Sequence, residues 1–133
     1  MYFPQNGDAV TPWIEVDRDG GALVAALLKA PAGTQLNGVS EFLSNKQWLN
    51  IWASHLGVQA QYQQIPFDEF IENDPVGIQR QLAETMAFVE EFGITGGDPS
   101  VVTPDELERQ TGIKIPRHSI ADHVKRQDWS ALL

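Results

Sequence analysis

The apolar positions of the chain are most concentrated in Ala22–Leu28, a run of seven residues without a polar interruption. An extended segment, Thr11–Val16, and an acidic turn, Asp17–Gly21, come before it. A helix that is apolar on every side must pack between layers or against a partner. We therefore expect a buried helix over residues 20–30, and a second layer or a second chain that covers it.

The ends of this helix carry ordinary start and stop signals. Asp17 or Asp19 is expected to cap its N-terminus, where a carboxylate also favours the helix dipole. Pro31 ends it, because proline cannot continue the hydrogen-bond ladder. A second extended segment, Gln35–Val39, follows, so that strand, helix and strand form a βαβ unit. The strands of such a unit lie parallel if they share a sheet.

The rest of the chain alternates helical and extended patterns. Met1–Val10 is expected to be an irregular lead-in because it is rich in turn-forming residues. The apolar tail, Asp128–Leu133, is expected to dock on the body of the domain. The pattern predicts one α/β domain over residues 1–133, with a small, mostly parallel sheet of about three strands and roughly four to six helices. Between lead-in and tail the predicted elements are a helix from Ser44 to its stop at Gly57, an extended run over Val58–Ile65, a short helix after Pro66, a long helix from Pro75 to Gly93, a loop over Ile94–Val102, a helix opened by the capping box Thr103–Glu106, and a helix from Ser119 to Gln127.

Composition narrows the functions that such a domain can have. The chain has 18 acidic and nine basic residues and a formal charge of −9. This charge repels nucleic acid and anionic lipid, so neither is an expected partner. The absence of cysteine excludes disulfides and thiolate metal sites. The run Ala22–Leu28 is too short to span a bilayer, and the N-terminus lacks the pattern of a signal peptide, so we expect a cytoplasmic protein.

Three groups of residues are candidates for chemistry. The Asp-x-Asp-Gly sequence of residues 17–20 resembles the start of a calcium loop but lacks the later ligands, so no metal site is expected. The glycines of residues 93–97 are not followed by Lys-Ser/Thr, which argues against a phosphate loop. His55 suits the last turn of a helix, whereas His118 and His123 approach one another across the start of the last helix and are candidates for a general base. No catalytic residue is assigned from the sequence.

Aromatic residues of several predicted elements form a candidate pocket for an apolar ligand. In the long helix, Phe88 and Phe92 lie at the margin of an apolar stripe centred on Leu82. Aromatic side chains at helical spacing usually belong to a core, and a pocket is the alternative. The candidate substrate-pocket residues are Trp13, Phe67, Phe70, Phe88 and Phe92.

Several stretches of the chain resemble a known family. They are PWIEVDRDGGALVAALLKAPAGTQLNGVSEFLS, then LGVQAQYQQIPFDEF, the long helix that closes in FVEEFG, and the terminal DWS. Together they resemble the NmrA-like family of atypical short-chain dehydrogenases, over essentially the whole chain but only the C-terminal half of the family. The resemblance implies a partial Rossmann-like fold that contains the substrate-side portion. It also implies that the helix over residues 20–30 packs against the Rossmann sheet in the full-length fold.

The same resemblance implies that this chain has no cofactor site of its own. In that family an N-terminal Rossmann domain holds NAD(P) on a glycine-rich turn between a strand and a helix. The chain contains no G-x-x-G-x-x-G turn and no Tyr-x-x-x-Lys; Tyr62, for example, is followed at the fourth place by Pro66. NAD(P) is therefore expected only if a missing N-terminal domain is supplied.

Four functions are compatible with these features. The first is a domain that binds a hydrophobic small molecule in secondary metabolism, without redox chemistry of its own. The second is a cofactor-independent isomerase or cyclase of a hydrophobic metabolite. The third is a fragment of an NAD(P)-dependent oxidoreductase, and the fourth is a regulatory interaction protein. We also expect a homo-oligomer or a partner chain that covers the helix over residues 20–30, because one small chain leaves apolar surface exposed.

Overall fold

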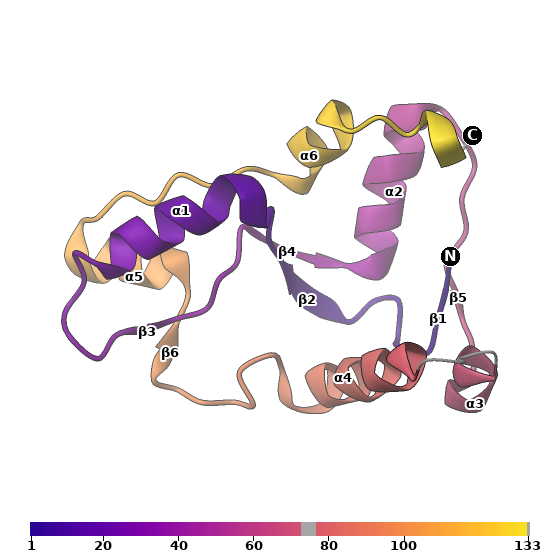
Figure 1. The fold of residues 1–133 in the computed structure, drawn as a ribbon, viewed down its shortest axis with the longest axis horizontal. Coiled ribbons are helices and arrows are strands. Elements are labelled where there is room, and N and C mark those ends of the chain that lie inside the picture. Colours follow the sequence, from indigo (N-terminus) through magenta and orange to yellow (C-terminus); the bar gives the residue numbers. More distant parts are fainter. Residues whose placement is uncertain (73–76, 133) are drawn as a thin grey trace.

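The computed structural model describes residues 1–72 and 77–132. Short strands join the helices into an open, elongated arrangement (Figure 1). Along the chain the elements are β1 (Tyr2–Phe3), β2 (Val10–Trp13), α1 (Val16–Leu27), β3 (Gln35–Leu36), β4 (Glu41–Ser44), α2 (Asn45–Leu56), β5 (Gln63–Gln64), α3 (Phe67–Ile71), α4 (Ile78–Phe92), β6 (Val101–Val102), α5 (Pro104–Thr111), α6 (Ile120–Arg126) and a final 3-10 turn (Ser130–Leu132).

The strands of the described residues form three two-stranded sheets. β2 pairs with β4 in the antiparallel direction, with Val10 opposite Ser44 and Trp13 opposite Glu41. β1 pairs with β5, and β3 with β6, in the parallel direction. The molecule is therefore α/β with small, mostly parallel sheets, as the sequence predicts.

The predicted βαβ unit differs from the structure in its pairing. β3 follows α1 as expected, but it pairs with β6 and not with β2. The neighbour of β2 is the segment after β3: the amide of Ser40 donates to the carbonyl of Trp13 at 2.8 Å, and Glu41–Ser44 continues the ladder. The chain turns back towards β2 before it pairs, and this makes the pair antiparallel.

Helix α1 begins earlier than predicted, at Val16, so the acidic residues lie inside its first turn. Glu15 is the N-cap residue, and its side chain makes no capping hydrogen bond to the first turn of the helix. The predicted cap by Asp17 or Asp19 is therefore wrong, because the carboxylate of Asp19 binds partners from other segments. Both acids still place negative charge at the positive end of the helix dipole.

Among the described residues, two separate hydrophobic cores join the helices α1, α2, α5 and α6 with the strands between them. In the first, Leu23 of α1 packs with Leu107 of α5. In the second, Leu43 of β4 is buried with Ile120 and Val124 of α6. Figure 1 shows α1 and α5 at one end of the molecule, and α6 beside α2 towards the other. β2 and β4 connect the two ends.

Only one face of α1 enters the first core. Leu23 and Ala26 are buried, whereas Val24, Leu27 and Leu28 are exposed. The chain by itself thus covers one face of this apolar helix and leaves the other open. The partner that we expect on the open face stays a prediction.

The helix signals around α2 and α5 are confirmed. The hydroxyl of Ser44 accepts from the amide of Gln47, whose side chain accepts in return from the amide of Ser44. Thr103 and Glu106 make the same reciprocal pair at the start of α5. Gly57 ends α2 in the left-handed conformation, with φ +68°, where glycine meets no steric penalty.

The short strands at the N-terminus differ from the prediction. The expected lead-in contains β1, which pairs with β5. Within the predicted extended run Val58–Ile65, only Gln63–Gln64 is strand. Both glutamines are exposed, so backbone pairing with β1, without side-chain burial, defines this strand. The predicted start of the long helix at Pro75 lies outside the described residues.

The described chain exposes more surface than a compact protein of its size. Its accessible surface is 8471 Å², whereas a globular monomer of this mass has about 7,000 Å². Leu82, predicted to centre the core face of α4, is exposed, and Ala83 is buried instead. Ile78, Phe88 and Phe92 are exposed on the same helix. The open arrangement therefore leaves apolar faces uncovered, although no described helix is long and apolar enough to cross a membrane.

Candidate functional site

Asp19, in the first turn of α1, is fully buried, with 0% of its surface exposed. Its Oδ2 accepts from the Ser40 hydroxyl at 2.5 Å and from the His118 amide at 3.0 Å, and its Oδ1 lies 2.5 Å from Nδ1 of His118. Burial alone would raise the pKa of Asp19, but these hydrogen bonds stabilise the carboxylate and hold its pKa below the usual value. The carboxylate therefore ties α1 to the segment that precedes α6.

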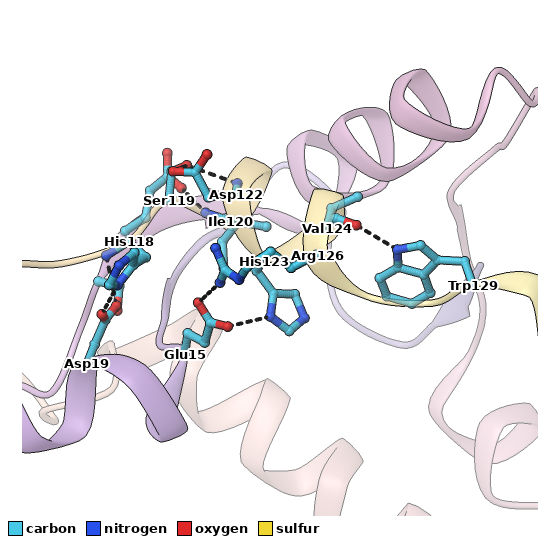
Figure 2. Close-up of polar contacts among 12 residues, drawn as sticks. Glu15, Asp19, His118, Ser119, Ile120, Asp122, His123, Val124, Arg126 and Trp129 are labelled. Carbon is cyan, nitrogen blue, oxygen red and sulfur yellow. Dashed lines mark hydrogen bonds and ion pairs between the residues drawn. The ribbon is translucent and has the colours of Figure 1, made fainter.

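Glu15 makes a second link from the same end of α1 to α6 (Figure 2). Its carboxylate pairs with the guanidinium of Arg126, and its Oε1 lies 3.2 Å from Nδ1 of His123. The hydrogen bond from Arg126 is the main cause that lowers the pKa of Glu15; burial opposes it, and His123 adds to it. Both acids are thus ionised at neutral pH and paired with the C-terminal part of the chain.

His118 and His123, which we expect to approach one another, instead each face a different carboxylate of α1 (Figure 2). A carboxylate on Nδ1 orients an imidazole and leaves Nε2 for another partner. The general-base role of either ring stays a prediction. Among the residues that the structure describes, no group of three or more His, Asp or Glu is placed to hold a metal ion.

All four tryptophans of the chain lie in one cluster beside the second core. The ring of Trp13 stacks on that of Trp48 at 5.8 Å, and Trp129 meets Trp48 and Trp52 edge-on at 6.5 and 6.1 Å. Aromatic rings prefer these offset and edge-on arrangements. Nε1 of Trp129 donates to the carbonyl of Val124 at 2.8 Å (Figure 2). The predicted docking of the tail is confirmed for Trp129, whereas residues 130–132 are exposed and Leu133 lies outside the described residues.

A groove of about 540 Å³, the tryptophan groove, opens beside this cluster. Trp48, Trp52, Trp129 and Leu132 line it, together with residues 59–61. Nε1 of Trp52 is buried and has no hydrogen-bond partner within the described residues. Indole rings, leucine side chains and a few polar groups in the wall of the groove are suited to an apolar molecule that carries a polar atom.

Two signals of the tryptophan groove are present in the sequence. Trp48 and Trp52 lie four residues apart, and residues at this spacing share a helix face. Trp129 lies in a tail that is expected to dock. These signals do not show that the tail docks on that helix, because the packing of α6 on α2 joins segments far apart in the chain.

The five aromatic residues predicted to share a pocket lie on three different elements. Trp13 belongs to β2 and the tryptophan cluster, Phe67 and Phe70 lie on α3, and Phe88 and Phe92 lie on α4. The ring centroids of Phe88 and Phe92 lie 5.2 Å apart, and the two residues are 48% and 50% exposed. Trp13 and Phe67 line separate hollows. The described structure does not gather the five around one cavity, and their substrate role stays a prediction.

A smaller hollow of about 190 Å³, the β2–α4 hollow, separates β2 from α4. Trp13, Met86, Val89 and Ile94 give it apolar walls, and Gln5 adds a polar group. Of the five predicted pocket residues, Trp13 lines this hollow.

The glycine-rich loop of residues 93–97 does not fit a dinucleotide. It follows α4 and leads to β6, so it offers no helix N-terminus to a phosphate. The carboxylate of Asp98 beside it accepts from the amide and hydroxyl of Ser100, which hold its pKa below the usual value. This negative charge would repel a phosphate, so the loop supports no nucleotide chemistry.

The described elements are the C-terminal portion of a Rossmann-like α/β fold, and solved structures of NmrA have the same fold. A structure described as NmrA, a negative transcriptional regulator, in complex with NAD matches with a TM-score of 0.64 and 20% identity, over 94% of this chain and 41% of that one. The complex of NmrA with NADP matches with a TM-score of 0.64 and 19% sequence identity. An NmrA with two substitutions matches with a TM-score of 0.66 and 21% sequence identity. The chain therefore spans about two-fifths of the length of these structures.

The model of the NmrA-like family matches residues 1–123, and the chain belongs to that family. A search among curated proteins finds no match. The resemblance seen in the sequence is thus confirmed, with the fold that it implies.

Proposed function

We propose that this chain is the ligand-side portion of an NmrA-like protein, and that the tryptophan groove binds a hydrophobic small molecule. The groove carries the proposal, because its volume of about 540 Å³ lies within the range of small-molecule sites, about 300–1,000 Å³. Three indole rings and Leu132 provide apolar contact area, and the side chains of Gln59 and Gln61 add polar groups at the edge. A ligand of secondary metabolism is one class with these properties.

The tryptophans themselves provide the measurement. Because all four belong to one cluster, their emission reports on this part of the molecule alone. Titration with Nile red, a neutral apolar dye that the negative chain does not repel, is expected to quench tryptophan emission in a saturable manner. The absence of saturable binding would overturn the proposal.

A matched pair of leucine variants assigns the dye to the groove. Leu132 lines the groove and is 68% exposed, whereas Leu28, the residue that follows α1, is 84% exposed. Leu132→Gln is expected to weaken dye binding by about fivefold, because it removes roughly 1 kcal/mol of apolar contact. Leu28→Gln is expected to bind as the wild type does. Equal loss in both variants would place the dye elsewhere.

Nicotinamide nucleotides are expected to bind outside this chain, because its glycine-rich loop has the wrong neighbours for a phosphate site. NmrA itself is described in complex with NAD and with NADP. Calorimetric titration of this chain with NADPH and with NADH should give no binding heat. Micromolar affinity for either nucleotide would favour an oxidoreductase.

A second candidate function is regulatory interaction with another protein surface. The exposed apolar side chains Ile78, Phe88 and Phe92 of α4 favour it, because exposed apolar surface on one element is typical of interaction sites. The solved NmrA structures are described as those of a negative transcriptional regulator. Two results together would support this candidate over the first. The wild-type chain would bind no dye in the groove, and Phe92→Ser would lose binding to a protein partner that the wild type binds.

A further inference from the structure

A further hollow, the α2–α6 hollow, lies between the last two turns of α2 and the helix α6, which packs beside α2 (Figure 1). Its volume of about 450 Å³ lies within the range of small-molecule sites, about 300–1,000 Å³. Among the described residues it shares no lining side chain with the tryptophan groove, so the two are separate places on the molecule. The lining residues are Asn50, Ile51, Ser54 and His55 of α2 with Ala121 and Lys125 of α6.

Ile51 and Ala121 provide the apolar part of this hollow, one from each helix. Both are half-buried. Ile51 also packs against the second core, which fixes its position. A ligand whose apolar body covers these two side chains removes apolar surface from water, and this favours binding.

Polar side chains surround the apolar part. Asn50 and Ser54 lie one helical turn apart on α2, and His55 follows in the last turn of that helix. All three residues are exposed, and within residues 1–72 and 77–132 their side chains make no hydrogen bond to the protein. Because they are open to solvent and not engaged elsewhere, a ligand in the hollow can reach them in place of water.

The charge around the hollow is positive, although the chain as a whole has a net charge of −9. Lys125 supplies an ammonium group, and no acidic residue of the described chain lines the hollow. Oδ1 of Asp122 lies 3.9 Å from Nζ of Lys125, whose side chain is 63% exposed. Such an exposed pair is weak, so the ammonium group can turn to an anion in the hollow. Charges more than about 10 Å away are largely screened by salt, so the local groups decide which ligand charge is favoured.

We propose that the α2–α6 hollow binds a small carboxylic acid with an apolar body. The carboxylate pairs with Lys125, and the body lies on Ile51 and Ala121. A carboxylate only accepts hydrogen bonds, and the amide of Asn50 and the hydroxyl of Ser54 are both able to donate. The site does not depend on the function proposed for the tryptophan groove, because other residues line it.

Two compounds, 4-phenylbutyrate and 4-phenylbutyramide, test this proposal, because they share an apolar body and only the first is charged at neutral pH. In ¹H–¹³C spectra of the chain, both are expected to shift the methyl signals of Ile51 and Ala121. The acid is expected to bind about threefold more tightly than the amide, the effect of one exposed ion pair. Equal affinity of the two compounds, or methyl signals that do not move at millimolar acid, would overturn the proposal.

A matched pair of lysine variants assigns the charge. Lys125→Gln removes the ammonium group at the hollow, so this variant should bind the acid and the amide equally. Lys29→Gln removes the same charge from an exposed lysine just after α1 and should keep the threefold preference for the acid. A preference that is lost equally in both variants would show that the net charge of the chain decides it, and this result would also overturn the proposal.

A variant that fills the hollow separates it from the tryptophan groove. Ser54→Phe places a ring in the hollow from an exposed position on α2. It is expected to abolish binding of both compounds and to leave Nile red binding unchanged. Binding of the acid that persists in Ser54→Phe would place the ligand outside the hollow and contradict the proposal.

Discussion

At the scale of single residues, Asp19 joins three segments of the chain through one carboxylate. Its oxygens bind the hydroxyl of Ser40 and both the amide and the ring of His118. Because the side chain is fully buried, water cannot replace these partners. Hydrogen bonds to an ionised acceptor are stronger than those to a neutral one, so the charge itself contributes to the free energy of unfolding.

The first prediction concerns this charge. Asp19→Asn keeps the shape of the side chain but removes the ionised acceptor, and we expect it to lower the free energy of unfolding by about 2 kcal/mol. Asp17→Asn, in the same turn of α1 but exposed, is the control and should change it by less than about 0.5 kcal/mol. Urea denaturation followed by circular dichroism measures both. Equal losses would show that only the helix dipole matters.

The same pair of proteins has a defined pH dependence. The pKa of Asp19 is lowered from 3.8 in the folded state, so its contribution is complete above that value and is lost as pH falls through the lowered pKa. The difference between wild type and Asp19→Asn should therefore be constant near neutrality and shrink below about pH 4. A difference that persists in acid would contradict the assigned role.

At the scale of elements, the helix starts show what local sequence can encode. Ser44 and Gln47 bind each other's backbone amides at the start of α2. Ser44→Ala removes one half of this pair and is expected to cost about 1 kcal/mol. Ser54→Ala, on the exposed side of the same helix, should be neutral or slightly stabilising because alanine favours helices. Thermal unfolding of the two variants provides the test, and equal melting temperatures would argue against the capping box.

The features that the sequence predicts correctly are those that depend on side chains within four or five residues of each other in the chain. Both helix starts and the glycine stop of α2 depend on neighbours in sequence, so the pattern is sufficient for them. The pairing of Asp19 with His118 spans 99 residues, and no local pattern specifies it. No local pattern specifies the pairing of β1 with β5 either, because each strand is only two residues long and too short to show an alternation of apolar and polar residues. The α/β class was predictable because it depends on the alternation of elements and not on their exact pairing.

At the scale of the whole molecule, the candidate sites follow from packing between distant elements. The tryptophan groove requires the tail to reach α2, and the β2–α4 hollow requires α4 to lie against β2. The sequence indicates that Ala22–Leu28 needs a cover, and the structure shows which side of the helix is left without one. It also shows a surplus of exposed surface over a compact chain of this mass.

The exposed side of α1 leads to the last prediction, which concerns association. Val24, Leu27 and Leu28 form an apolar face that water solvates unfavourably, so two chains gain free energy when they bury it against each other. Sedimentation of the wild type is expected to show a mass that rises with concentration. Leu27→Asp places a charge on this face and should remain monomeric, because an unpaired charge resists burial. Leu132→Asp, an equally drastic change at an exposed leucine outside α1, should associate as the wild type does. A wild type that stays monomeric at every concentration would show that the face is covered by something other than a second copy.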